Sequence, residues 1–150
     1  MTYFDAVARA GFMDRTDADL EHWLAPGALF PAFHVFRALA RGETMRQVRI
    51  EAASLLACAV RDGRRLTLVV ANTSTQAATV HLTLPGLAGG RLALADETTL
   101  PALIWNPLWV DTAARSVPGP LEGLELSLPR QAVGFLSGSL VGSDAQRARF

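Results

Sequence analysis

A single helix is indicated by the run Leu29-Phe30-Pro31-Ala32-Phe33-His34-Val35-Phe36-Arg37-Ala38-Leu39-Ala40-Arg41-Gly42. Four apolar residues in it recur at the i, i+4, i+7, i+11 spacing of one helix face, which Phe30 and Leu39 widen: Leu29, Phe33, Phe36 and Ala40. Pro31 suits the first turn of a helix, and Gly42 suits the left-handed position just past its end. We therefore expect one amphipathic helix that ends at residue 42. Its apolar face must bury against a neighbouring helix or sheet.

After Gly42 the apolar residues follow a period of two, which is typical of strands. Strand-like runs occur at residues 54–60, 65–71, 77–84, 91–95, 124–128 and 131–137. Asp62-Gly63 between the first two runs is a strong hairpin signal. Turns are expected at residues 72–75 and 86–90, and residues 96–120 are less regular. Strands at this spacing predict a mainly β fold, an antiparallel β-sandwich.

The change of pattern at residue 42 also predicts two unequal parts. Before it, residues 2–8 could form a short buried strand, but one strand and one helix are too little for a domain. The 108 residues after it suit a sandwich. We expect residues 1–42 to be the end of a larger domain, residues 43–138 a β-sandwich and residues 139–150 a frayed tail.

Composition excludes several classes of function. The net charge is zero, with 14 basic and 14 acidic residues and no basic run, so no nucleic-acid partner is expected. No stretch of about 18 apolar residues is available to span a membrane. The single cysteine, Cys58, excludes an internal disulfide. The residues after Met1 do not read as a signal peptide, so a cytoplasmic location is expected.

The residues of the chain do not assemble a catalytic or metal-binding set. Its histidines, residues 22, 34 and 81, have no paired Cys or carboxylate at ligand spacing. Cys58 lies in an apolar run and suits a structural core position better than a nucleophile. Asp96 and Glu97 are neighbours in sequence, which is not the facing pair of carboxylates that a glycosidase needs. We therefore predict no catalytic residue, no metal and no cofactor.

Two tryptophans near Pro107 allow two interpretations. Exposed aromatic side chains stack on sugar rings, whereas buried ones fill a core or anchor one domain on another. Pro107 favours an irregular loop, which keeps sugar stacking open for Trp105 and Trp109. Packing is the favoured interpretation, and both residues remain candidates for substrate binding. His81, between Thr79 and Thr83, suits a solvated sheet face.

Residues 2–42 resemble the last strand and last helix of a (β/α)8 barrel. The stretches that carry the resemblance are Thr2-Tyr3-Phe4-Asp5-Ala6-Val7 and Pro26-Gly27-Ala28-Leu29-Phe30-Pro31-Ala32-Phe33-His34-Val35-Phe36-Arg37-Ala38-Leu39-Ala40. They are similar to the barrel of D-apionate lactonase-like proteins, relatives of the retaining-clan glycoside hydrolases. In such enzymes a β-sandwich follows the last barrel helix and packs against the side of the barrel. Residues 43–137 resemble that sandwich in pattern.

The resemblance implies that the catalytic carboxylates lie on earlier barrel strands, outside this chain. Active sites of such barrels lie at the C-terminal ends of the strands. In this chain only Tyr3, Asp5 and Arg9 could contribute there as substrate-binding residues. Where the family pattern has an aromatic residue followed by Arg-Gly, this sequence has Ala8-Arg9-Ala10-Gly11.

The leading interpretation is an accessory C-terminal β-sandwich region of a carbohydrate- or sugar-acid-acting hydrolase, not catalytic by itself. Its implied partners are the missing barrel domain and a sugar or sugar acid. The alternative is a stand-alone β-sandwich module that binds carbohydrate or another protein. The sequence leaves the substrate and the oligomeric state open.

Overall fold

The computed structural model describes residues 31–50 and 52–141. The described elements, in chain order, are α3 Pro31–Leu39, β1 Thr44–Arg46, β2 Leu55–Asp62, β3 Arg65–Asn72, β4 Ala78–Thr83, β5 Leu87–Ala95, α4 Leu100–Leu103, α5 Trp109–Ala113, β6 Arg115–Pro118, β7 Glu122–Leu128 and β8 Val133–Leu140. The prediction of a mainly β fold is confirmed. The predicted strand at residues 2–8 lies outside the described residues.

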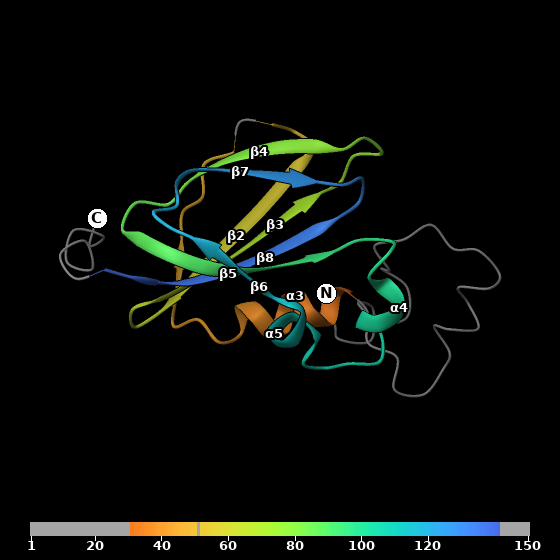
Figure 1. Ribbon diagram of the computed structural model, residues 1–150, viewed down its shortest axis with the longest axis horizontal. Helices are drawn as coiled ribbons and strands as arrows, with labels where there is room; N and C mark the ends of the chain where they lie inside the picture. The colour runs from red at the N-terminus through yellow and green to blue at the C-terminus, as the bar shows by residue number, and fades with distance from the viewer. Residues whose placement is uncertain (1–30, 51, 142–150) are drawn as a thin grey trace.

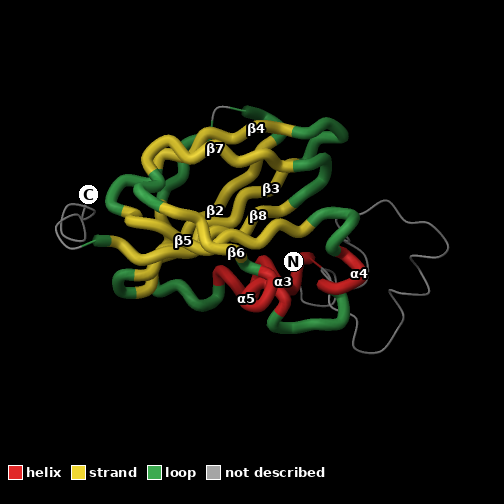
Figure 2. Tube along the Cα trace, viewed as in Figure 1, coloured by secondary structure: helices red, strands yellow, loops and turns green. Residues whose placement is uncertain are grey.

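The strands form a six-stranded sheet and a two-stranded sheet, in the orders β1-β2-β3-β8-β5-β6 and β4-β7. Every described strand pair is antiparallel. Figure 1 shows β4 and β7 over one face of the large sheet, with α3 and α5 against the other. Figure 2 shows the same layering, with the helices gathered on one side of the strands. The protein is therefore a β-sandwich with a helical layer on the outer face of the large sheet.

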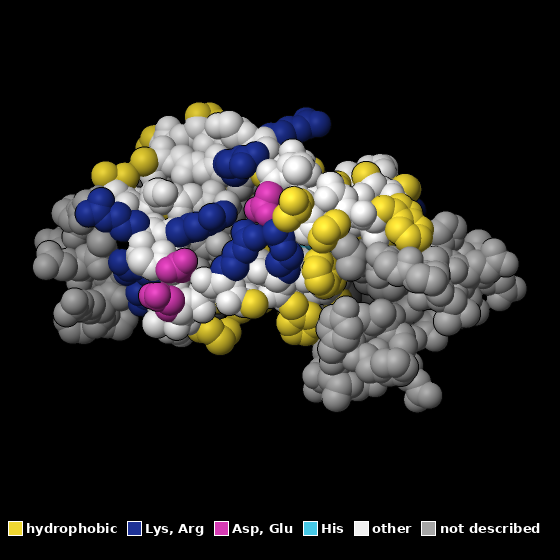
Figure 3. Space-filling view, turned by 90° about the horizontal axis from the view of Figure 1, so that it is seen from below, with side chains coloured by type: hydrophobic (Ala, Val, Ile, Leu, Met, Phe, Trp, Pro, Cys, Tyr) yellow, Lys and Arg dark blue, Asp and Glu magenta, His cyan; other side chains and the backbone are white. Residues whose placement is uncertain are grey.

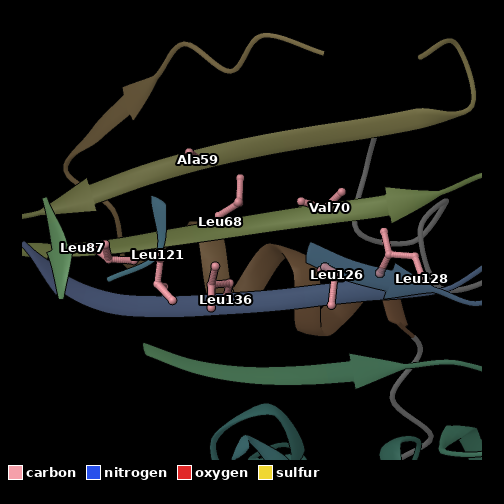
Figure 4. Packing of buried hydrophobic residues seen from close by; sticks show 8 residues of the cluster. All are labelled: Ala59, Leu68, Val70, Leu87, Leu121, Leu126, Leu128 and Leu136. Carbon is pink, nitrogen blue, oxygen red and sulfur yellow. The ribbon is translucent and has the colours of Figure 1, made fainter. Parts of the chain in front are cut away.

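An aliphatic core fills the space between the two sheets (Figure 4). Its buried members are Ala59, Leu68, Val70, Leu87, Leu121, Leu126, Leu128 and Leu136. The alternation predicted for residues 65–71 is confirmed, since Leu66, Leu68 and Val70 all belong to this core. On β4, Val80 and Leu82 likewise face inward while His81 is exposed.

A second core lies between the outer face of the large sheet and the helices. Val69, Phe135 and Ala93 stand in register across β3, β8 and β5, and all three are buried. Leu103 of α4 and Trp109 of α5 pack onto this row. Adjacent strand residues point to opposite faces, so the same strands supply both cores.

A buried asparagine links the ends of the two sheets. Asn72, 2% exposed at the end of β3, donates from its side-chain amide to the carbonyl oxygens of Gln76, Leu128 and Pro129. Its Oδ1 accepts from the Ser74 backbone N–H at 3.0 Å. Both halves of the amide are therefore satisfied, as a buried polar group requires.

Three local expectations are wrong. Residues 86–90 were expected to form a hairpin loop, but strand β5 begins at Leu87 and includes Gly89 and Gly90 beside a register shift. Glycine is needed there because a Cβ on Gly90 would lie 2.8 Å from the Ser137 carbonyl oxygen. The irregular segment 96–120 contains α4, α5 and β6. Strand β8 continues to Leu140, inside the segment expected to fray.

The junction at Gly42 is built differently from the expectation. Helix α3 ends at Leu39, and the Gly42 N–H donates to the Leu39 carbonyl at 3.0 Å. Gly42 is not among the described glycines with positive φ. Its role is steric, because a Cβ there would overlap the Cβ of Val60 on strand β2. The expected boundaries at residues 42 and 138 remain predictions.

Candidate functional site

Helix α3 rests on the large sheet through a side that overlaps the expected apolar face at Leu39. Val35, Ala38 and Leu39 pack against the outer core, whereas Phe36 and Ala40 are exposed. Phe36 is 52% exposed. The helix is thus apolar on two sides. One faces the sandwich, and the other has no cover among the described residues.

His34 is buried between α3 and the short helices. Its Nε2 lies 3.2 Å from the Leu103 carbonyl oxygen, so Nε2 carries the proton and donates. Its ring meets those of Phe33 and Trp109 edge-on, at centroid distances of 5.3 and 6.3 Å. Burial lowers the pKa of His34 more than the hydrogen bond to Leu103 raises it, and the nearby Arg37 charge lowers it further. The imidazole is therefore a neutral packing group.

Asp111 of α5 forms two ion pairs, one with Arg37 of α3 and one with Arg41 just after that helix. Arg37 donates to its Oδ2 at 3.0 Å, and Arg41 reaches its Oδ1 at 3.5 Å. Burial raises the pKa of Asp111, but the Arg37 hydrogen bond and the charges of Arg41 and Arg37 outweigh it, so the pKa lies below its usual value. The carboxylate therefore stays ionised at neutral pH.

A polar row crosses the large sheet next to the apolar row. Thr67, Ser137 and Arg91 pair in register across β3, β8 and β5, on the face that carries the helices. Arg91 donates to the backbone carbonyls of Asp111 and Ala114, at 3.1 and 3.0 Å. These carbonyls belong to the last turn of α5 and the residue after it, where a cation is favoured.

A hollow of about 50 Å³ opens where this row meets α3 and α5. We call it the arginine hollow, because four arginines line it together with Asp111, Thr67 and Ser137: Arg37, Arg41, Arg65 and Arg91. Figure 3, which views the helix-bearing side, shows basic side chains gathered around an acidic one. The hollow is therefore the candidate site in the described part of the chain.

The predicted substrate-binding residues do not come together in the described structure. Tyr3, Asp5 and Arg9 lie outside the described residues. Trp105 is 52% exposed, whereas Trp109 is 6% exposed beneath α3, so only Trp105 has an indole face free to stack on a ligand. Whether any of the five binds substrate stays a prediction.

Other polar candidates have structural partners. As expected, His81 lies on the solvated face of β4. Its Nδ1 is 3.8 Å from Glu125 Oε2. Burial raises the pKa of Asp96, but hydrogen bonds from Thr98 and Thr99 outweigh it and hold the pKa below its usual value. In residues 31–50 and 52–141, no group of three or more His, Cys, Asp or Glu could hold a metal ion. Within the same ranges, no helix is long and apolar enough to cross a membrane.

Sequence reasoning missed the arginine hollow, although a signal existed. Arg37 and Arg41 are spaced i, i+4 at the end of the predicted helix, and Arg65 and Thr67 occupy the strand phase opposite to Leu66 and Leu68. The signal lies in the polar residues that alternate with the apolar ones on this strand. The sequence could not show that α5 brings Asp111 beside Arg37 and Arg41.

No known family model and no curated protein matches the sequence. Among solved structures, the chain is similar to a GH30 endoxylanase from Clostridium papyrosolvens C71, with a TM-score of 0.55 and 13% identity over 74% of this chain. It is also matched to a GH family 44 xyloglucanase from Paenibacillus polymyxa, with a TM-score of 0.47 and 13% identity over 61% of this chain and 18% of that chain.

The chain has the fold of part of a glycoside hydrolase. The aligned region spans 28% of the endoxylanase, so the likeness concerns a minor portion of that enzyme. At this identity the comparison concerns the fold alone. The chain therefore shares its sandwich fold with part of that enzyme.

Proposed function

We propose that this chain is the C-terminal accessory β-sandwich region of a carbohydrate- or sugar-acid-acting hydrolase, and that it is not catalytic by itself. The observation that carries the proposal is the fold match to 28% of the endoxylanase chain. On this proposal α3 is the last barrel helix, and the barrel domain holds the catalytic carboxylates. The resemblance of residues 2–42 to D-apionate lactonase-like proteins supports a sugar lactone as the finer substrate class.

The two apolar sides of α3 give the proposal a physical basis. A helix that only covered the sandwich would need one apolar side. Phe36 is half exposed on the other side, while Val35 and Ala38 face the sheet. A barrel packed against Phe36 would bury this second side and make α3 common to both domains.

The first test uses the DNA immediately upstream of Met1. We expect an in-frame stretch that encodes alternating strands and helices of a barrel. The purified 150-residue chain should hydrolyse neither xylan, aryl glycosides nor sugar lactones. Turnover that survives rigorous purification would contradict the non-catalytic assignment.

A second test asks whether α3 docks the barrel. The upstream segment and this chain are produced as separate polypeptides, mixed, and followed by light scattering and by hydrolase assay. We expect a one-to-one complex that Phe36→Asp weakens at least about tenfold, because the new carboxylate would be buried without a partner. Thr79→Asp adds the same charge to the exposed face of β4 and serves as the control. Equal loss in both variants would count against this docking side.

A stand-alone carbohydrate-binding module is the second candidate, favoured by the exposure of Trp105. Tryptophan fluorescence during titration with xylo-oligosaccharides tests it. Binding through this indole should disappear in Trp105→Ala and persist in Leu108→Ala, which truncates a neighbour of similar exposure. No fluorescence change in the wild type up to millimolar sugar would remove this candidate.

A further inference from the structure

We propose that the arginine hollow binds an oxyanion group, a phosphate, sulfate or carboxylate. The inference stands without the proposed function, because it rests on described side chains alone. Arginines from separate parts of the chain converge there: Arg37 from α3, Arg41 from the turn after it, Arg65 from β3 and Arg91 from β5. A guanidinium presents a planar fork of N–H donors that matches carboxylate and phosphate oxygens.

The described residues that line the hollow do not balance its local charge. Asp111 is the one carboxylate among the described residues that line the hollow, and it accepts from Arg37 and Arg41. Asp62 pairs in register with Arg65 but lines only the adjoining smaller hollow. In the described part of the chain, no carboxylate lies within 4 Å of the Arg65 guanidinium. His34, which also lines the hollow, adds no negative charge.

Four like charges at one place repel each other, and an anion between them would relieve that repulsion. The guanidinium of Arg91 donates to the backbone carbonyl of Asp111 on α5. This hydrogen bond positions the Arg91 side chain before any ligand arrives. Within the described part of the chain the Arg65 guanidinium has no ion-pair partner, and Arg65 projects from the strand that also carries Thr67. Fixed donors lower the ordering cost of binding.

The remaining lining suits oxygen atoms. Thr67 and Ser137, directly opposite each other on β3 and β8, bring two hydroxyl groups to the floor of the hollow. Hydroxyl groups can donate to an anion. The volume of about 50 Å³ is small beside the roughly 300–1,000 Å³ of typical small-molecule sites. The hollow therefore fits a single charged group, either free or carried on a larger molecule whose remainder stays outside.

The test is calorimetric titration of the full 150-residue chain with inorganic phosphate at low ionic strength. Arg65→Gln should weaken phosphate binding about tenfold, the usual scale for losing a hydrogen bond to a charged group. Arg64→Gln is the matched control. It removes the same charge one residue earlier, in the exposed hairpin outside the hollow, and should change affinity less than about twofold.

Thr67→Val provides a second variant that leaves the charge unchanged, and circular dichroism checks that each variant is folded. NMR signals of the arginine Nε–H groups give a readout independent of heat, with shifts expected for Arg65 and Arg91. Absence of binding in the wild type, or equal weakening by Arg64→Gln and Arg65→Gln, would overturn the site.

Parallel titrations identify the source of the anion. Glucuronate, acetate and glucose separate a sugar acid from a free oxyanion and from a neutral sugar. Glucuronate binding tighter than acetate and lost in Arg65→Gln supports a sugar acid, and equal affinities for acetate and phosphate support a free oxyanion. Glucose binding that survives Arg65→Gln, with none from the anions, would overturn the proposal.

Discussion

The two faces of the six-stranded sheet are built from alternate residues of the same strands, yet they are covered in different ways. The inner face meets β4 and β7 mainly through aliphatic side chains, with Asn72 as a buried polar link at one end. The outer face meets helices, and it carries an apolar row at Val69 and Phe135 beside a polar row at Thr67 and Ser137. The inner face is thus a uniform packing surface, and the outer face combines packing with the charged arginine hollow.

The largest expected effect comes from truncating a buried leucine of the inner core. Leu128 of β7 is 0% exposed, so Leu128→Ala should lower the free energy of unfolding by about 2–5 kcal/mol through lost burial and a cavity. Leu56→Ala is the control, because Leu56 is 57% exposed and its truncation should cost less than about 0.5 kcal/mol. Urea denaturation measures both. A similar loss in the two variants would mean that the inner core does not dominate stability.

The next effect concerns Gly42, just after α3, where the chain comes close to Val60 on the outer face of the large sheet. Gly42→Ala would force a methyl group into the Val60 side chain, and such overpacking costs about 1–3 kcal/mol. Gly63→Asn is the control, because a Cβ there has no atom within 4 Å and Asn tolerates its positive φ of 53°. Thermal unfolding compares them. An unchanged midpoint for Gly42→Ala would refute the close approach to Val60.

A smaller effect concerns pH and the buried imidazole of the outer layer. The pKa of His34 is lowered in the folded state, whereas an unfolded histidine titrates near about 6.5. The unfolded chain then binds more protons than the folded chain as pH falls below that value, so stability decreases. It should be insensitive to this group at higher pH.

Denaturation between pH 5 and 8 measures that contribution. The decline at acid pH should be shallower in His34→Leu and in His34→Gln, which keeps a donor for the Leu103 carbonyl. Nδ1 has no hydrogen-bond partner among the described residues, so a proton there would be buried without an acceptor. Equal slopes in wild type and both variants would exclude His34 as the source.

The contrast between the faces also explains what the sequence could and could not predict. Strand alternation predicts the inner core, because Leu66, Leu68 and Val70 need only a period of two and a partner sheet. The hairpin at Asp62-Gly63 follows from local turn chemistry. Gly63 is the first residue of the loop and has a positive φ. Both features depend on residues near one another in the chain.

The outer face depends on contacts between distant residues. Asp111 lies 74 residues from Arg37, and His34 lies 69 residues from Leu103. Helices α4 and α5 have four and five residues, too few to show a helical period in the sequence. The burial of Trp109 and the exposure of Trp105 follow from how these short helices fold back onto α3. Neither composition nor residue spacing predicts that these two helices fold back onto α3.

The smallest expected effect on stability, Asp111→Asn, separates structure from binding on the outer face. The side chain of Asp111 is 38% exposed, and ion pairs of this kind contribute about 0–1 kcal/mol, so the free energy of unfolding should fall only slightly at pH 7. Because the pKa of Asp111 is lowered by folding, any contribution is present above about pH 4 and fades as pH falls through the folded pKa. Removing this carboxylate leaves Arg37 and Arg41 without their charge partner. Phosphate titrated into Asp111→Asn should therefore bind more tightly than to wild type, and weaker binding would show that Asp111 holds the arginines in place rather than competing with the anion.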